Sequence, residues 1–159
     1  RILNDIKNVK SLSQADQENY LIYKTFAELF NDQKVRLGKV LNEVPIFSSH
    51  KRGQNISILT IRILANVQRK EFGKVGDQVE ALKRYAGRYL RNNDNYRSYL
   101  WIKICIRLVQ SKFNKKAFIR KSREEYELLK ANPLKNYRKE LSSEIVRFED
   151  CYEFILSNL

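Results

Sequence analysis

The apolar residues of this chain recur at intervals of three and four along most of its length, and this spacing limits the fold more than any other feature. The clearest example is the C-terminal run Leu134, Tyr137, Leu141, Ile145, Phe148, Tyr152, Ile155 and Leu159. Residues at this spacing line one face of an α-helix, so each such run predicts a helix that buries one side. The 159 residues contain only five glycines and two prolines. The sequence therefore predicts an all-α fold of about seven helices.

Breaks between these runs divide the chain into helix pairs within a single domain. Ser11, the first residue of a capping box, is predicted to start the first pair. Gly73 and Gly76 are predicted to separate the helices of the middle pair, and Asn132 with Pro133 to start the last helix. The approximate units are 13–45, 54–91 and 95–130, followed by a final helix over 133–159.

The helix pairs repeat along the chain. Phe30, Phe72 and Phe113 each close a long predicted helix, at spacings of 42 and 41 residues. A short polar break and a second helix follow each of them, so the sequence predicts stacked helical hairpins. Residues of the middle unit match the turn and second helix of a known repeat signature: Phe72, Gly73, Val79, Ala81 and Leu82. This pattern resembles the tetratricopeptide-repeat superfamily over roughly residues 13 to 130.

The resemblance implies a right-handed array of antiparallel helix hairpins. In such a TPR-like α-solenoid the first helices of the hairpins line a concave face, and the helix over 133–159 would cap the array. The unit is longer than the roughly 34 residues usual in that superfamily, so the helices must be longer than is typical. A HEAT-like or irregular helical array is the alternative.

The stretch from Arg97 to Arg123 is predicted to hold the central helix. It contains many basic residues and no acidic one, threaded through closely spaced apolar side chains. Trp101 lies in its most apolar part, where packing in the core is favoured over a role as a platform for base stacking. The neighbouring tyrosines are predicted to lie in the core or at the edge of a groove: Tyr85, Tyr89, Tyr96 and Tyr99.

The charge balance predicts an anionic partner. Lysine and arginine number 31 against 18 aspartates and glutamates, which gives a formal net charge of +13. Nucleic acid, an anionic membrane surface and an acidic protein all fit this charge. No apolar stretch is long enough to span a membrane, and no signal peptide is visible. Cys105 and Cys151 lie far apart without a CxxC pattern, so we expect free thiols and a cytoplasmic location.

The sequence does not show the ligands or bases at defined spacing that metal binding and nucleophilic catalysis need. His50 is the single histidine, and neither GxxxxGK[ST] nor GxGxxG occurs. Adjacent acids such as Glu124 and Glu125 point in different directions on a helix and do not converge on one substrate atom. We therefore expect no enzyme activity, no metal site and no cofactor.

The repeat predicts one candidate binding surface, a basic groove. When the units are aligned on their phenylalanines, with offsets of 41 and 42 residues, polar positions of the first helices coincide. The groove would be floored by Lys24, Arg62, Asn66, Arg69, Lys103 and Arg107. Stacked helices would place these side chains side by side, where they could bind an acidic protein segment. The alternative is that these cations are simply solvent-exposed residues at the edges of the helices and bind no partner.

A second candidate surface follows the central helix and would bind nucleic acid. It comprises Lys112, Lys115, Lys116, Arg120, Lys121 and Arg123. Such a cluster can bind phosphates, although the sequence contains no helix-turn-helix, RNA-binding or zinc motif. The sequence thus favours a non-catalytic protein-interaction module, with a nucleic-acid-binding helical domain as the alternative.

Overall fold

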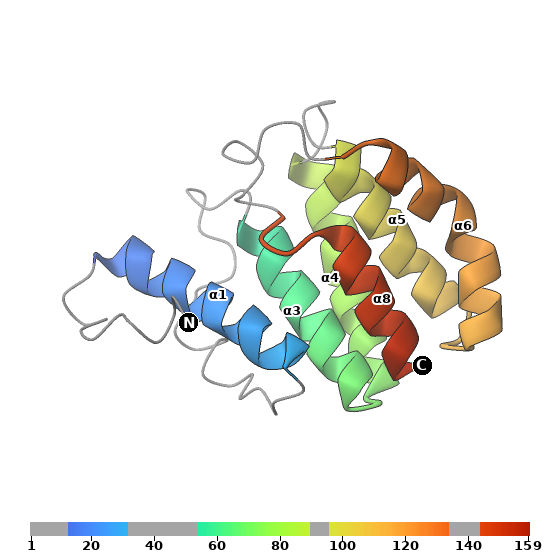
Figure 1. Ribbon diagram of the computed structural model, residues 1–159, viewed down its shortest axis with the longest axis horizontal. Coiled ribbons are helices and arrows are strands. Elements are labelled where there is room, and N and C mark those ends of the chain that lie inside the picture. Colours follow the sequence, from blue (N-terminus) through green and yellow to red (C-terminus); the bar gives the residue numbers. More distant parts are fainter. Residues whose placement is uncertain (1–12, 32–53, 90–95, 134–143) are drawn as a thin grey trace.

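The computed structural model describes residues 13–31, 54–89, 96–133 and 144–159. These residues form six helices and no strand, namely α1 (Gln14–Phe30), α3 (Gln54–Gln68), α4 (Phe72–Tyr89), α5 (Tyr96–Gln110), α6 (Lys115–Ala131) and α8 (Phe148–Asn158) (Figure 1). The predicted all-α fold is confirmed over this part of the chain. The second helix of the predicted unit 13–45, His50, and the boundary between the units 54–91 and 95–130 lie outside the described residues.

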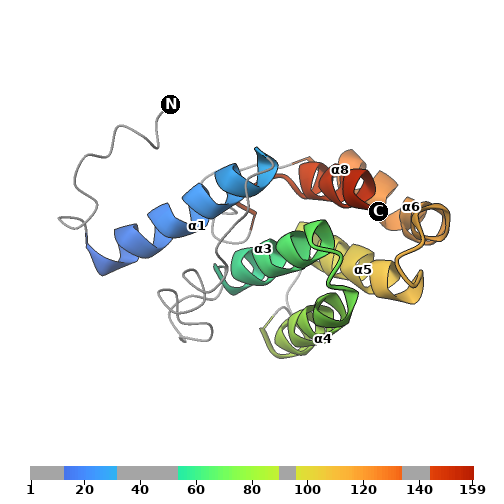
Figure 2. The same ribbon diagram turned by 90° about the horizontal axis from the view of Figure 1, so that it is seen from below.

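The helices pack as two hairpins with α8 laid across both. Helix α3 pairs with α4, α5 pairs with α6, and α4 also packs against α5. In Figure 2, α3 and α5 lie between α4 on one side and α8 on the other. Helix α8 contacts α3 as well as α6. It is therefore not confined to the end of the last hairpin, where a terminal cap was expected.

The buried face of α8 explains this position. Its buried residues are Phe148, Cys151, Tyr152, Phe154 and Ile155. They cover a wider arc of the helix than the single stripe that the sequence suggested, so one neighbouring helix cannot cover them all. Tyr152 packs against Phe118 and Tyr126 of α6, while Phe154 meets Phe30 at the end of α1.

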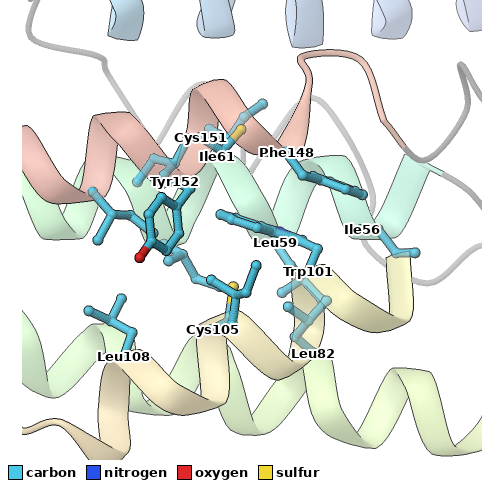
Figure 3. Packing of buried hydrophobic residues seen from close by; sticks show 14 of the residues in the cluster. Ile56, Leu59, Ile61, Leu82, Trp101, Cys105, Leu108, Phe148, Cys151 and Tyr152 are labelled. Carbon is cyan, nitrogen blue, oxygen red and sulfur yellow. The ribbon is translucent and has the colours of Figure 1, made fainter. Parts of the chain in front are cut away.

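The core is centred on α3 and α5, which confirms the predicted central helix. Trp101 of α5 is completely buried, and its indole N–H donates to the Thr60 hydroxyl of α3 at 2.9 Å. Its ring stacks on Phe148 of α8, with 5.2 Å between the ring centroids (Figure 3). One side chain thus joins three helices. Trp101 is a core residue, and its burial rules out a role as an exposed platform for bases.

The turn between α3 and α4 is made by residues 69–71 and not by the glycines. Gly73 and Gly76 lie inside α4, so the predicted break at these positions is wrong. Lys70 has a φ of 59°, its N–H donates to the Val67 carbonyl, and the next N–H donates to the Asn66 carbonyl. These bonds satisfy the last carbonyls of α3, so the backbone can end the helix without glycine.

The predicted helix boundaries at Ser11 and Asn132 also need correction. Helix α1 is capped by Ser13, whose hydroxyl oxygen accepts the Asp16 N–H at 3.2 Å. Asn132 does not start the last helix but ends α6, and its side-chain amide donates to the Leu128 carbonyl.

The last helix is shorter than the apolar spacing predicted. Residues 144–147 are not helical, and α8 begins at Phe148. The reason is a tertiary contact of Glu144. One of its carboxylate oxygens accepts the Phe148 N–H at 2.9 Å, and both carboxylate oxygens accept hydrogen bonds from Arg97 of α5. A helix passing through residue 144 could not offer its side chain to its own fourth residue and to α5 in this way.

Arg97 connects α5, the end of α6 and the start of α8. Its guanidinium donates to the carboxylates of Glu144 and Glu149 and to the carbonyls of Leu129 and Asn132. These contacts use all five N–H groups that an arginine side chain has. Burial by itself would lower the pKa of Arg97, but the hydrogen bonds and charges of the two glutamates raise it overall. The side chain therefore remains cationic.

The two cysteines report on whether this core is closed. Cys105 and Cys151 are free and fully buried, and burial raises the pKa of both thiols above the ordinary value. Because the thiolate is the reactive form, we expect iodoacetamide to label neither residue in the folded protein at neutral pH and both after unfolding. Mass spectrometry of the labelled protein checks this. Rapid labelling in the native state would mean that α8 does not stay docked.

Candidate functional site

Three of the predicted groove residues are at least partly accessible, namely Lys24, Arg69 and Lys103. Lys24 of α1 is exposed, and its Nζ lies 3.9 Å from a Glu28 carboxylate oxygen. Arg69 is exposed just after α3. Lys103 of α5 is partly buried and holds its Nζ 4.8 Å from the centroid of the Tyr99 ring.

The other three groove residues, Asn66, Arg107 and Arg62, are less available to a ligand because they are wholly or partly buried or already paired. Asn66 is buried with 3% exposure. Arg107 forms an ion pair with Glu125 of α6 at 3.0 Å and donates to Gln110. Arg62 is half-buried, burial lowers its pKa, and its Nε is buried without a hydrogen-bond acceptor among the described residues. The predicted row of cations is therefore interrupted by a buried amide and by an ion pair.

The helix ends also give a different alignment of the repeats. Lys70 and Lys112 each donate their N–H to the carbonyl three residues earlier. In both turns the following residue donates its N–H to the carbonyl five residues before it. Residues 70 and 112 are 42 apart, whereas the predicted groove used an offset of 41 for this pair of units. With an offset of 42, Lys103 corresponds to Ile61, which is fully buried. Arg62 and Lys103 therefore do not occupy equivalent positions.

The second candidate surface is fully accessible. We call it the α6 basic cluster: Lys112, Lys115, Lys116, Arg120, Lys121 and Arg123. All of these residues are exposed, and no ion pair or side-chain hydrogen bond joins any of them to another described residue. The cluster therefore has no acidic partner in the part of the chain that the structure describes.

The start of α6 gives the cluster its shape. The Asn114 side chain caps the helix by accepting the Ala117 N–H at 3.0 Å. Lys116, Arg120 and Arg123 follow at helical spacing and lie opposite the buried face of α6. The first turn has no acidic residue, although acids are the residues that stabilise this end of a helix dipole. Positive charge accumulates at a helix end where a bound anion would relieve it.

Two exposed tyrosines on α5 lie outside both candidate surfaces. Tyr96 is 42% exposed and Tyr99 is 47% exposed. They are three residues apart and thus neighbours on one helix face, which continues to Lys103. Tyr85, in contrast, is buried, and the side chain of Tyr89 lies outside the described residues.

The sequence missed the pairing of basic residues with distant acids. Arg97 and Arg107 belong to the same basic stretch as the α6 basic cluster, yet Arg97 binds Glu144 and Glu149, and Arg107 binds Glu125. One signal was available for Arg97, because it lies four residues before Trp101 and three before Leu100, on the apolar side of its helix.

Neither a metal-binding group nor a membrane-spanning helix occurs among the described residues. No group of histidine, cysteine, aspartate and glutamate side chains there could hold a metal ion. Within the same residue ranges, no helix is both long and apolar enough to cross a membrane.

Comparison with known proteins adds no relative from which a function could be transferred. No family model, curated protein or solved structure matches the chain. The resemblance to tetratricopeptide repeats therefore rests on the sequence pattern, and any function must be argued from the surfaces of this chain.

Proposed function

We propose that this chain is a non-catalytic helical domain that binds nucleic acid through the phosphate backbone, with the α6 basic cluster as the main contact. The observation that supports this proposal is the group of exposed cations without a described acidic partner. The net charge of +13 agrees with a polyanionic ligand. The free, buried cysteines support a reducing, cytoplasmic setting.

Phosphate binding fits these side chains for a physical reason. Each lysine or arginine that meets a phosphate releases condensed counterions, so many weak contacts together give substantial affinity without reading a sequence. Arg120 and Arg123 lie on one face of α6 and can follow a backbone of regularly spaced phosphates. The first turn of α6, which begins at Lys115, adds backbone N–H groups that can bind an anion.

An acidic protein segment is the second candidate ligand, in the groove that the sequence predicted. Its support is the Arg62 Nε, which is buried without a hydrogen-bond acceptor and could be satisfied by a ligand carboxylate. In this reading the hairpins form the right-handed, tetratricopeptide-like array that the sequence pattern implies. The interrupted row of groove cations makes it the weaker of the two proposals.

The salt dependence of binding tests the proposed function. We expect the triple variant Lys116→Gln, Arg120→Gln, Arg123→Gln to bind RNA and DNA oligonucleotides more weakly. Log K falls as log salt rises, and in the triple variant this fall should be less steep by about 2 to 3 units of slope, because about one unit is lost for each phosphate contact. Fluorescence anisotropy with labelled oligonucleotides at several salt concentrations measures both quantities.

A matched control separates this surface from net charge. The variant Lys83→Gln, Arg84→Gln, Arg88→Gln removes three exposed charges from α4 and should leave the slope nearly unchanged. Equal effects of the two triple variants would overturn the assignment to α6. Loss of acidic-peptide binding on reversing Arg62 and Lys103 to Glu, without oligonucleotide binding by the wild type, would favour the second candidate.

A further inference from the structure

The exposed face of α5 combines aromatic rings with positive charge. Tyr96 and Tyr99 are 42% and 47% exposed, and they lie three residues apart on the same side of the helix. Lys103 follows one turn later, and its Nζ lies 4.8 Å from the centroid of the Tyr99 ring. We call these three residues the tyrosine–lysine stripe.

The stripe is unusual because the same helix buries its other large side chains. Trp101, Leu100 and Ile104 of α5 are almost completely inside the core. Tyr96 and Tyr99 instead leave much of their aromatic surface in contact with water, where large aromatic side chains gain little stability. Their exposure therefore suggests a partner that covers flat rings.

The stripe and the α6 basic cluster belong to one helical hairpin. The exposed face of α5 carries Tyr96, Tyr99 and Lys103 and reaches Gln110 at the end of the helix, and Lys112, the first residue of the α6 basic cluster, follows in the turn to α6. At a rise of about 1.5 Å per residue, α5 from Tyr96 to Gln110 is roughly 21 Å long, enough for several nucleotides. An anionic strand that lies on α6 can thus reach the tyrosines without leaving this hairpin.

We propose that the tyrosine–lysine stripe is a base-stacking platform and that the nucleic acid bound by this chain is single-stranded. This inference rests on the proposed function. In a duplex the bases stack on one another and hide their faces, whereas a single strand leaves them free to stack on aromatic side chains. Lys103, whose ammonium group lies against the Tyr99 ring, would hold a phosphate beside the stacked base.

The test compares single-stranded and duplex probes on the full chain. The probes are a labelled oligouridine of about 15 nucleotides, within the site sizes of such proteins, and a mixed-sequence duplex of equal length. We expect wild type to prefer the single strand. The double variant Tyr96→Ala, Tyr99→Ala should lower single-strand affinity at least about fivefold, the low end for one base–aromatic contact, and leave duplex affinity unchanged.

Two further variants identify the ring as the cause. Tyr99→Phe keeps the aromatic face and should retain single-strand binding, whereas loss of binding would assign the effect to the hydroxyl and overturn stacking. Tyr23→Ala removes a tyrosine of similar exposure from α1 and should change nothing. Because all three tyrosines are exposed, circular dichroism should show unchanged folding of each variant.

The outcomes separate this inference from the proposed function. If oligonucleotides bind and the α6 triple variant weakens them, but the tyrosine variants do not, stacking is wrong and backbone binding stands. A wild-type preference for duplex has the same meaning. If neither probe binds while an acidic peptide does, the proposed function has failed and the stripe is not a platform for bases.

Discussion

Replacing Arg97 by alanine is expected to lower the free energy of unfolding by about 3 to 5 kcal/mol. The substitution leaves the carboxylates of Glu144 and Glu149 without their cation, and Glu144 has a side-chain exposure of only 2%. It also removes the donors to two carbonyls at the end of α6. Urea denaturation followed by fluorescence measures the change, because Trp101 is the single tryptophan.

Arg147 provides the matched control for this prediction. It binds Asp150 through two hydrogen bonds at the start of α8, but the Arg147 and Asp150 side chains are 61% and 43% exposed. Exposed pairs contribute little, so Arg147→Ala should cost far less stability than Arg97→Ala. Equal losses for the two variants would show that the buried network does not anchor α8.

The contribution of Arg97 should persist at alkaline pH. Burial lowers the pKa of Arg97, but the hydrogen bonds and charges of Glu144 and Glu149 outweigh this effect and raise its pKa in the folded protein above the ordinary value. A raised pKa gives stability that is present below the unfolded-state pKa and is lost only as the pH rises through the folded-state pKa. Deprotonation of this arginine therefore removes no stability up to about pH 12.

Replacing Phe148 by alanine is expected to cost a similar 3 to 5 kcal/mol, roughly the range for a buried phenylalanine. The side chain is 1% exposed and stacks on Trp101 with an angle of 2° between the ring planes. Its removal opens a cavity between α5 and α8 that neighbouring side chains fill only in part. Thermal unfolding followed by circular dichroism measures the loss.

Phe148→Leu refills most of this volume and should recover a large part of the lost stability. The alanine variant should also accelerate labelling of Cys151, which lies one turn along α8. An unchanged melting temperature in Phe148→Ala would contradict docking of α8, and its apolar face would then be available to a partner.

The helices themselves could be predicted from the sequence because their signal is local. Apolar residues at spacings of three and four marked parts of all six described helices, and the surroundings of Trp101 correctly indicated the core. Boundaries were predicted less well. Gly73 and Gly76 looked like breaks, yet the turn at Lys70 satisfies the last carbonyls of α3, and α4 continues through both glycines.

The two candidate surfaces differ in how well the sequence could predict them. The cations of the α6 basic cluster lie off the apolar face of one helix, so their exposure followed from helical spacing alone. The groove instead depended on aligning α3 with α5. A shift of one residue turns a side chain by about 100° around the helix, which is enough to align Lys103 with a buried isoleucine.

The sequence by itself determined that the chain is helical, that Trp101 is internal and that positive charge is in excess, because each depends on neighbouring residues or on composition. Only the tertiary structure decided which charges are neutralised. Arg97 and Glu144 are 47 residues apart, and Arg107 and Glu125 are 18 apart. No local pattern links such partners. They meet because apolar faces bring α5, α6 and α8 together, and the cations left without such partners form the surface proposed here to bind a ligand.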